Sequence, residues 1–149
     1  MVATQPTILL VTGAFTTGAC YDRLLPYLQK AGYPYAVAAL PSAKPTDPAN
    51  HSAMSDGEYV LEEFLMPLLH EGTDIVVFAH SFGATCLGGA DVPIAKTARQ
   101  AQGMKGGVLG LVYISFAFVP EGKTQLDVLG GQWPPFCKED TVCHTLSHL

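Results

Sequence analysis

The segment Ala79-His80-Ser81-Phe82-Gly83 has the residue spacing most specific to one kind of chemistry. A serine stands at its centre, with a small residue two positions before it and another two positions after it. A turn that lifts a serine above the edge of a sheet is so tight that only small residues fit at those two positions. The pattern therefore predicts that Ser81 is a catalytic nucleophile. The alternative interpretation is an ordinary turn without chemistry.

Two backbone N–H groups are candidates for binding the negative charge that develops when a serine attacks a carbonyl group. Phe82 directly follows Ser81 at the start of a helix predicted from Gly83 onward, where N–H groups carry partial positive charge. Ala14 lies in the loop after the first apolar run, where this kind of site takes its second donor. We therefore predict an oxyanion hole formed by the N–H groups of Ala14 and Phe82.

The loop from Gly13 to Gly18 resembles the start of a phosphate-binding loop. Such a loop needs a lysine and a hydroxyl residue after its last glycine to hold phosphates and magnesium. Those two positions are Ala19 and Cys20. We therefore predict no nucleotide site and expect no cofactor.

Four residues with metal-ligand chemistry stand near the C-terminus: Cys137, Cys143, His144 and His148. Structural zinc sites use more closely spaced cysteines and a folded loop between their ligand pairs. We therefore expect no metal site.

Apolar runs that alternate with helical patterns must position these residues. Strands are predicted at 7–12, 35–40, 74–79 and 108–118, and helices at 21–30, 55–70, 93–102 and 121–129. Ser55 and Glu58 match a capping box at the start of the second helix. The alternation predicts an α/β fold with a doubly wound, mostly parallel sheet of about four strands. We expect residues 1–149 to form a single domain, with 133–149 as a poorly structured tail because they show no periodicity.

The motifs VTGAF, AHSFGA and GGVLGLVYISFAFVPEG resemble those of α/β-hydrolases, particularly fungal members related to plant methylesterases and hydroxynitrile lyases. The resemblance runs from residue 7 to about residue 140. It implies a partial α/β-hydrolase fold and a cofactor-free serine hydrolase or lyase. It also implies a small apolar carbonyl substrate and a role in secondary metabolism. Thr12 stands where the family usually has a histidine that braces the oxyanion loop.

The acid and the histidine that complete the catalytic triad of this family are not identifiable in the sequence. In the family they follow strands downstream of 108–118, so we expect a C-terminally truncated domain. Asp127 with His144 or His148 keeps the family order, but no predicted strand positions these histidines. His80 is expected to point away from Ser81. Two hypotheses follow: an active serine hydrolase, or a truncated, non-catalytic protein that retains the nucleophile turn.

Composition limits the partners of this 149-residue chain. The net charge of -5, with no basic cluster, argues against nucleic acid and anionic membranes as partners. Residues 1–6 lack the pattern of a signal peptide, so we expect a cytoplasmic location. Only 14 % of the residues are charged, against about 25 % in typical soluble domains. We therefore expect an exposed apolar sheet edge through which copies of the chain form a homo-oligomer.

Overall fold

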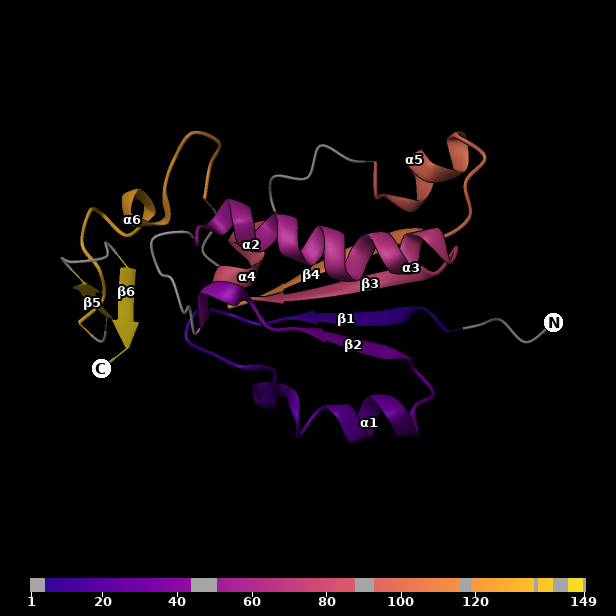
Figure 1. Ribbon diagram of the computed structural model, residues 1–149, viewed down its shortest axis with the longest axis horizontal. Coiled ribbons are helices and arrows are strands. Elements are labelled where there is room, and N and C mark those ends of the chain that lie inside the picture. Colours follow the sequence, from indigo (N-terminus) through magenta and orange to yellow (C-terminus); the bar gives the residue numbers. More distant parts are fainter. Residues whose placement is uncertain are drawn as a thin grey trace.

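A four-stranded parallel sheet forms the centre of the protein in a computed structural model, which describes residues 5–43, 51–87, 93–115, 119–135, 137–140 and 145–148. The strands are β1 (Thr7–Val11), β2 (Tyr35–Ala38), β3 (Asp74–His80) and β4 (Gly107–Ile114). They lie in the order β2-β1-β3-β4, and every neighbouring pair is parallel (Figure 1). The predicted α/β class and four-stranded sheet are therefore confirmed, and the arrangement is consistent with a partial α/β-hydrolase fold.

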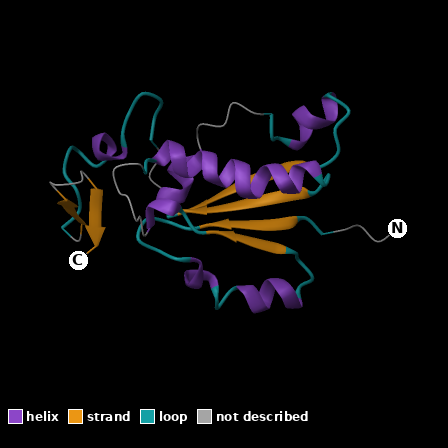
Figure 2. Ribbon diagram, in the orientation of Figure 1, coloured by secondary structure: helices purple, strands orange, loops and turns teal. Residues whose placement is uncertain are grey.

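Helices cover both faces of this sheet (Figure 2). On one face lies α1 (Leu25–Lys30), after the 3₁₀ turn η1 (Gly18–Tyr21). On the other lie the continuous run of α2 (Ala53–Val60), η4 (Leu61–Leu65) and α3 (Met66–His70), together with α4 (Phe82–Cys86) and α5 (Lys96–Ala101). A second 3₁₀ turn, η2 (Pro41–Ala43), follows β2, and α6 (Gln125–Val128) lies beyond β4. The sheet is thus doubly wound, as predicted.

The core lies between the sheet and the α2–α3 run. The central strand β1 is buried on both faces, as expected of a parallel strand between two others. In β3, buried residues alternate with half-buried ones, so one face of this strand enters the core. The largest fully buried side chains there include Leu9, Val77, Val60 and Leu69. Burying each such aliphatic side chain stabilises the fold by about 1.5–3 kcal/mol.

The helical run over 53–70 begins earlier than predicted. The Ser52 hydroxyl accepts the N–H of Ser55 at 3.1 Å, and the Ser55 hydroxyl accepts the N–H of Ser52 at 2.8 Å. This reciprocal pair satisfies the first amides of the helix one turn before Glu58. The predicted box of Ser55 and Glu58 is therefore wrong. The predicted helix end is right, because Gly72 follows it with a φ of 76°.

β4 lies at one edge of the sheet in the described part of the chain, and β2 lies at the other edge. Large apolar side chains on β4 are 39–51 % exposed: Leu109, Leu111, Val112, Tyr113 and Ile114. Of the longer strand predicted at 108–118, residues 116–118 lie outside the described residues. Association of copies through the β4 edge stays a prediction.

Two further strands, β5 (Cys137–Asp140) and β6 (Thr145–His148), pair as an antiparallel hairpin. Figure 1 shows it beyond the carboxyl ends of the four parallel strands. The sequence pattern does not predict this hairpin, because its residues do not alternate between apolar and polar types.

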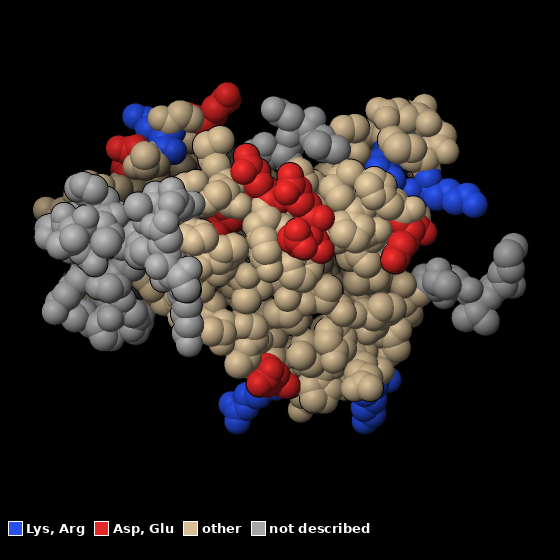
Figure 3. Space-filling view, viewed as in Figure 1, with Lys and Arg blue, Asp and Glu red and all other residues tan. Residues whose placement is uncertain are grey.

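The charged side chains on the face drawn in Figure 3 are few. Acidic groups gather over the α2–α3 run, where the exposed acids are Glu58, Glu62 and Glu63. Within the described residues, no helix has the length and apolar character required to cross a membrane.

Candidate active site

Ser81 stands between the end of β3 and the start of α4, in the strand-turn-helix context that the sequence predicts. Its backbone has a φ of 51° and a ψ of -121°. A residue with a side chain rarely adopts such a conformation, which costs on the order of 1–3 kcal/mol and persists only where the surroundings fix it. Such strain clusters at functional sites. The conformation is the one that a raised nucleophile requires, and the catalytic role of Ser81 stays a prediction.

The backbone of Ser81 is held by the elements on either side of it. Its N–H donates to the carbonyl oxygen of Ile114 at 2.9 Å, which ties the turn to the end of β4. Its carbonyl oxygen accepts the N–H of Ala84 at 3.0 Å, which starts α4. The position of Ser81 is therefore fixed by main-chain hydrogen bonds that do not depend on its side chain.

Two glycines bring the loop after β1 against the turn. A Cβ atom on Gly83 would lie 2.3 Å from the carbonyl oxygen of Thr12, closer than any such contact allows. A Cβ atom on Gly13 would lie 3.1 Å from the Cβ of Ser81 and 3.0 Å from Nδ1 of His80. Gly83 must be small because the backbone of Thr12 passes over it, whereas the sequence pattern attributed its size to the tightness of the turn itself. Gly13 places the loop that carries Ala14 beside Ser81.

Hydrogen bonds hold this loop in place. The Thr16 hydroxyl donates to the carbonyl oxygen of Gly13 at 2.8 Å, and the Tyr21 hydroxyl donates to that of Val11 at 2.9 Å. Thr12, fully buried, accepts the N–H of Leu40 at 3.2 Å with its hydroxyl oxygen. Thr12 therefore braces the loop against the segment after β2, at the position where the family resemblance implies a histidine. The sequence analysis did not identify this role or that of Tyr21.

The two predicted oxyanion donors lie on neighbouring segments. Ala14 is in the turn directly after Gly13, and Phe82 is the first residue of α4. β1 and β3 are adjacent and parallel, so both segments leave the same edge of the sheet. The arrangement brings the two segments together, and their role as donors stays a prediction.

Burial changes the chemistry of two groups around the turn. It raises the pKa of the Tyr21 hydroxyl to about 12, so this group stays protonated and donates at neutral pH. It also raises the pKa of the Cys86 thiol to about 12, with a smaller effect from the nearby charge of Asp56. The Cys86 thiol donates to the carbonyl oxygen of Phe82 at 3.3 Å. Because the thiolate is the reactive form, Cys86 is a packing residue and not a nucleophile.

A general base for Ser81 is not found in the described part of the chain. No side chain there hydrogen-bonds the Ser81 hydroxyl, and the Nδ1 atom of His80 packs against Gly13. His144 lies outside the described residues, and His148 is in β6. The carboxylate of Asp127 accepts the N–H and the hydroxyl of Thr124, at 2.7 and 2.8 Å, as the cap of α6. These bonds lower the pKa of Asp127.

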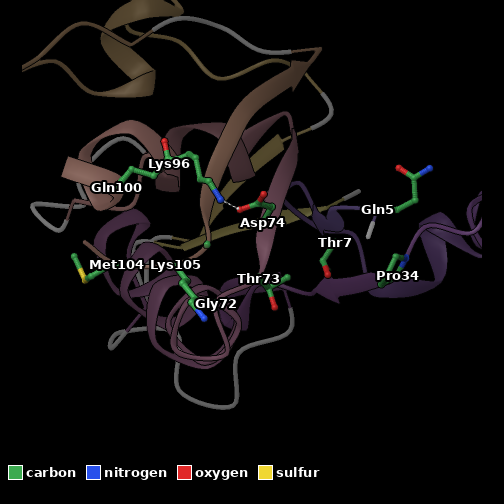
Figure 4. A pocket seen from close by; sticks show the side chains of 11 residues that line it. Gln5, Thr7, Pro34, Gly72, Thr73, Asp74, Lys96, Gln100, Met104 and Lys105 are labelled. Atoms are coloured by element: carbon green, nitrogen blue, oxygen red, sulfur yellow. Dashed lines mark hydrogen bonds and ion pairs between the residues drawn. The ribbon is translucent and has the colours of Figure 1, made fainter. Parts of the chain in front are cut away.

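Two cavities lie away from Ser81. A groove of about 1220 Å³ runs between α2, α4 and the β4 side chains Leu111 and Tyr113. A smaller cavity of about 530 Å³ opens at the opposite, amino end of the strands, beside Thr7 (Figure 4). There Lys96 and Asp74 point toward one another and form an ion pair. Ser81 lines neither of these cavities.

Comparison with known proteins gives a distant relative. The chain is similar to a protein of Phoma sp. named Probable hydrolase R7, with 29 % identity over 129 residues. These residues are 87 % of this chain and 50 % of the relative, so the chain spans about half the length of that protein. No family model matches the chain, and no solved structure matches it.

Proposed function

We propose that this protein is a serine hydrolase that cleaves an ester or a related carbonyl bond of a small apolar molecule, with Ser81 as its nucleophile. The observation that carries the proposal is the φ of 51° at Ser81, a residue with a side chain, on a turn between a strand and a helix. The similarity to a probable hydrolase supports the same reaction class. The resemblance to fungal α/β-hydrolases favours a substrate from secondary metabolism.

The reaction requires a nucleophile, a base and oxyanion donors around the substrate carbonyl. The Ser81 oxygen attacks the carbonyl carbon while a base takes the hydroxyl proton, and the π electrons move to the carbonyl oxygen. The N–H groups of Ala14 and Phe82 would bind this oxyanion, and loss of one such donor typically lowers kcat by about 10²–10³-fold. Collapse of this intermediate breaks the bond to the leaving oxygen, which takes the proton from the base and departs as the alcohol, and an acyl-enzyme remains. Water then attacks the acyl carbon while the base takes its proton, and this proton returns to the Ser81 oxygen as the acid is released.

A non-catalytic, hydrolase-like protein is the second candidate. In the described part of the chain, the Ser81 hydroxyl makes no hydrogen bond to a basic side chain, and this observation favours the second candidate. A serine without its base is a weak nucleophile, and the residual rate enhancement from binding and oxyanion donors is about 10³–10⁴-fold over water. The two candidates therefore differ in whether Ser81 is activated.

Intact-mass labelling with a fluorophosphonate, which modifies activated serines, separates them. Ser115 offers a matched control, because it is exposed, has a φ of 50° and follows the neighbouring strand β4. We expect one label per chain, lost in Ser81→Ala and retained in Ser115→Ala. A folded sample that takes up no label would support the non-catalytic candidate.

A further inference from the structure

Asp56 is a buried acidic residue that the proposed mechanism does not use. It is fully buried in the first turn of α2. One carboxyl oxygen accepts the N–H of Ser42 at 3.2 Å, and the other accepts the Ser42 hydroxyl. Burial of a carboxyl group is costly unless it is hydrogen-bonded. Asp56 therefore holds η2, which contains Ser42, against α2.

The segment that contains Ser42 is hydrogen-bonded to the loop beside Ser81. Leu40, two residues before Ser42, donates its N–H to the Thr12 hydroxyl, and Thr12 donates its own N–H to Ala38 at 3.0 Å. The carbonyl oxygen of Thr12 lies against Gly83. A shift of η2 would therefore move Thr12, and with it the loop on which Ala14 lies.

Asp56 also lies beside the helix that starts at the turn. Its charge raises the pKa of the Cys86 thiol, second to burial, which places it near the last residue of α4. The next residue, Gly57, is so close to α4 that a Cβ atom on it would lie 2.2 Å from the carbonyl oxygen of Cys86. The same turn of α2 thus contacts both the η2 segment and α4.

We propose that Asp56 is a positioning residue for the nucleophile turn. By joining η2 to α2, it fixes the loop after β1 on one side of Ser81 and α4 on the other. It acts through Ser42 and Thr12 and touches no reacting atom. The inference rests on the proposed function of Ser81, because positioning has a catalytic meaning only if Ser81 reacts.

Amide hydrogen exchange tests whether Asp56 holds the nucleophile turn and the loop after β1 in place, and it requires no reaction. We compare the parent protein with Asp56→Ala, Asp56→Asn and Ser42→Ala, and use Glu62→Ala as a control at an exposed position of the same helical run. Loss of buried hydrogen bonds should raise exchange of residues 12–16 and 81–83 by about tenfold in Asp56→Ala and Ser42→Ala. Asn keeps the size of Asp and still accepts the Ser42 N–H, so Asp56→Asn should restore protection. The β3 amides of Ile75 and Val77 should not change.

The rate of fluorophosphonate labelling tests the catalytic part. A turn that is misplaced by a fraction of an ångström should lower the maximal labelling rate of Asp56→Ala by about tenfold or more, because nucleophile geometry is lost. The concentration for half-maximal labelling should stay within about twofold of the parent value, and Asp56→Asn should recover the rate.

Two results would overturn the inference. One is unchanged exchange of residues 12–16 and 81–83 in both Asp56→Ala and Ser42→Ala. The other is an equal increase at Ile75 and Val77, which would make Asp56 a general stability residue. If Asp56→Ala does not fold, Ser42→Ala and Asp56→Asn give the same comparison. An unlabelled parent protein would refute the proposed function alone, because the exchange experiment still tests Asp56.

Discussion

The N–H of Ser81 donates to the carbonyl oxygen of Ile114 at 2.9 Å, so the last residue of the edge strand β4 holds the candidate nucleophile. Ile114 is itself 42 % exposed. The turn therefore depends on the strand with the least cover in the described part of the chain. Its other supports, Gly13 and Gly83, are buried, so a side chain added at either position should disturb the turn.

Gly83→Ala should destabilise the fold and abolish labelling of Ser81. The new Cβ would lie 2.3 Å from the Thr12 carbonyl oxygen, a backbone atom that cannot move aside. Overpacking of this kind costs about 1–3 kcal/mol, measured as the free energy of unfolding in urea. Gly110→Ala is the matched control, because a Cβ atom there meets nothing within 4 Å. Equal stability of the two variants would contradict the packing argument.

Gly13→Ala should lower the labelling rate of Ser81 with little loss of stability. Its Cβ would lie 3.1 Å from the Ser81 Cβ and 3.0 Å from Nδ1 of His80, contacts that small shifts can relieve. We expect the unfolding free energy to fall by less than about 1 kcal/mol. The labelling rate should fall by about tenfold, because Ser81 is displaced relative to the loop. A labelling rate equal to that of the parent would show that the loop does not form part of the site.

The turn could be predicted from the sequence because its signature, a serine between two small residues, lies within residues 79–83. Gly72 likewise ends its helix through its own backbone, with a φ of 76°. The contacts that support the turn are not local: Gly83 must be small because the backbone of Thr12 passes over it. The bond from Leu40 to Thr12 joins residues 28 apart, and that from Ser42 to Asp56 joins residues 14 apart. Neither periodicity nor spacing indicates these pairs, since only the sheet brings them together.

The helix start at Ser52 shows a different limit. The Ser55 and Glu58 box and the Ser52 and Ser55 pair are both acceptable caps by residue type. The structure selects the earlier one, so the helix begins at Ala53 and Asp56 lies in its first turn. The sequence therefore indicates that a helix begins here but does not choose between caps, and the choice decides where Asp56 lies.

Alkaline pH should destabilise the protein through Cys86. Burial raises the pKa of this thiol from 9.0 to about 12. Below pH 9 the thiol is protonated in both the folded and the unfolded chain, so its contribution to stability is fully present. Between about pH 9 and 12 only the unfolded chain releases the proton, and the free energy of unfolding falls by up to about 1.4 kcal/mol per pH unit.

Urea unfolding of the parent and of Cys86→Ser at a series of pH values measures this contribution. The slope between pH 9 and 11 should be shallower in Cys86→Ser, since serine does not titrate there. The two slopes should agree between pH 6 and 8. Identical slopes above pH 9 would show that the thiol is not protected from ionisation in the folded protein.

Leu111→Lys should weaken association of the chain with itself. Leu111 is 43 % exposed on β4, and an edge strand with uncharged, apolar side chains invites pairing with another copy. A lysine there would have to be buried on association, so we expect at least about a tenfold higher dissociation constant by sedimentation velocity. Tyr27→Lys is the control, because Tyr27 is 72 % exposed on α1, on the other side of the sheet. A parent protein that stays monomeric at all concentrations, or an equal effect of both variants, would refute association through β4.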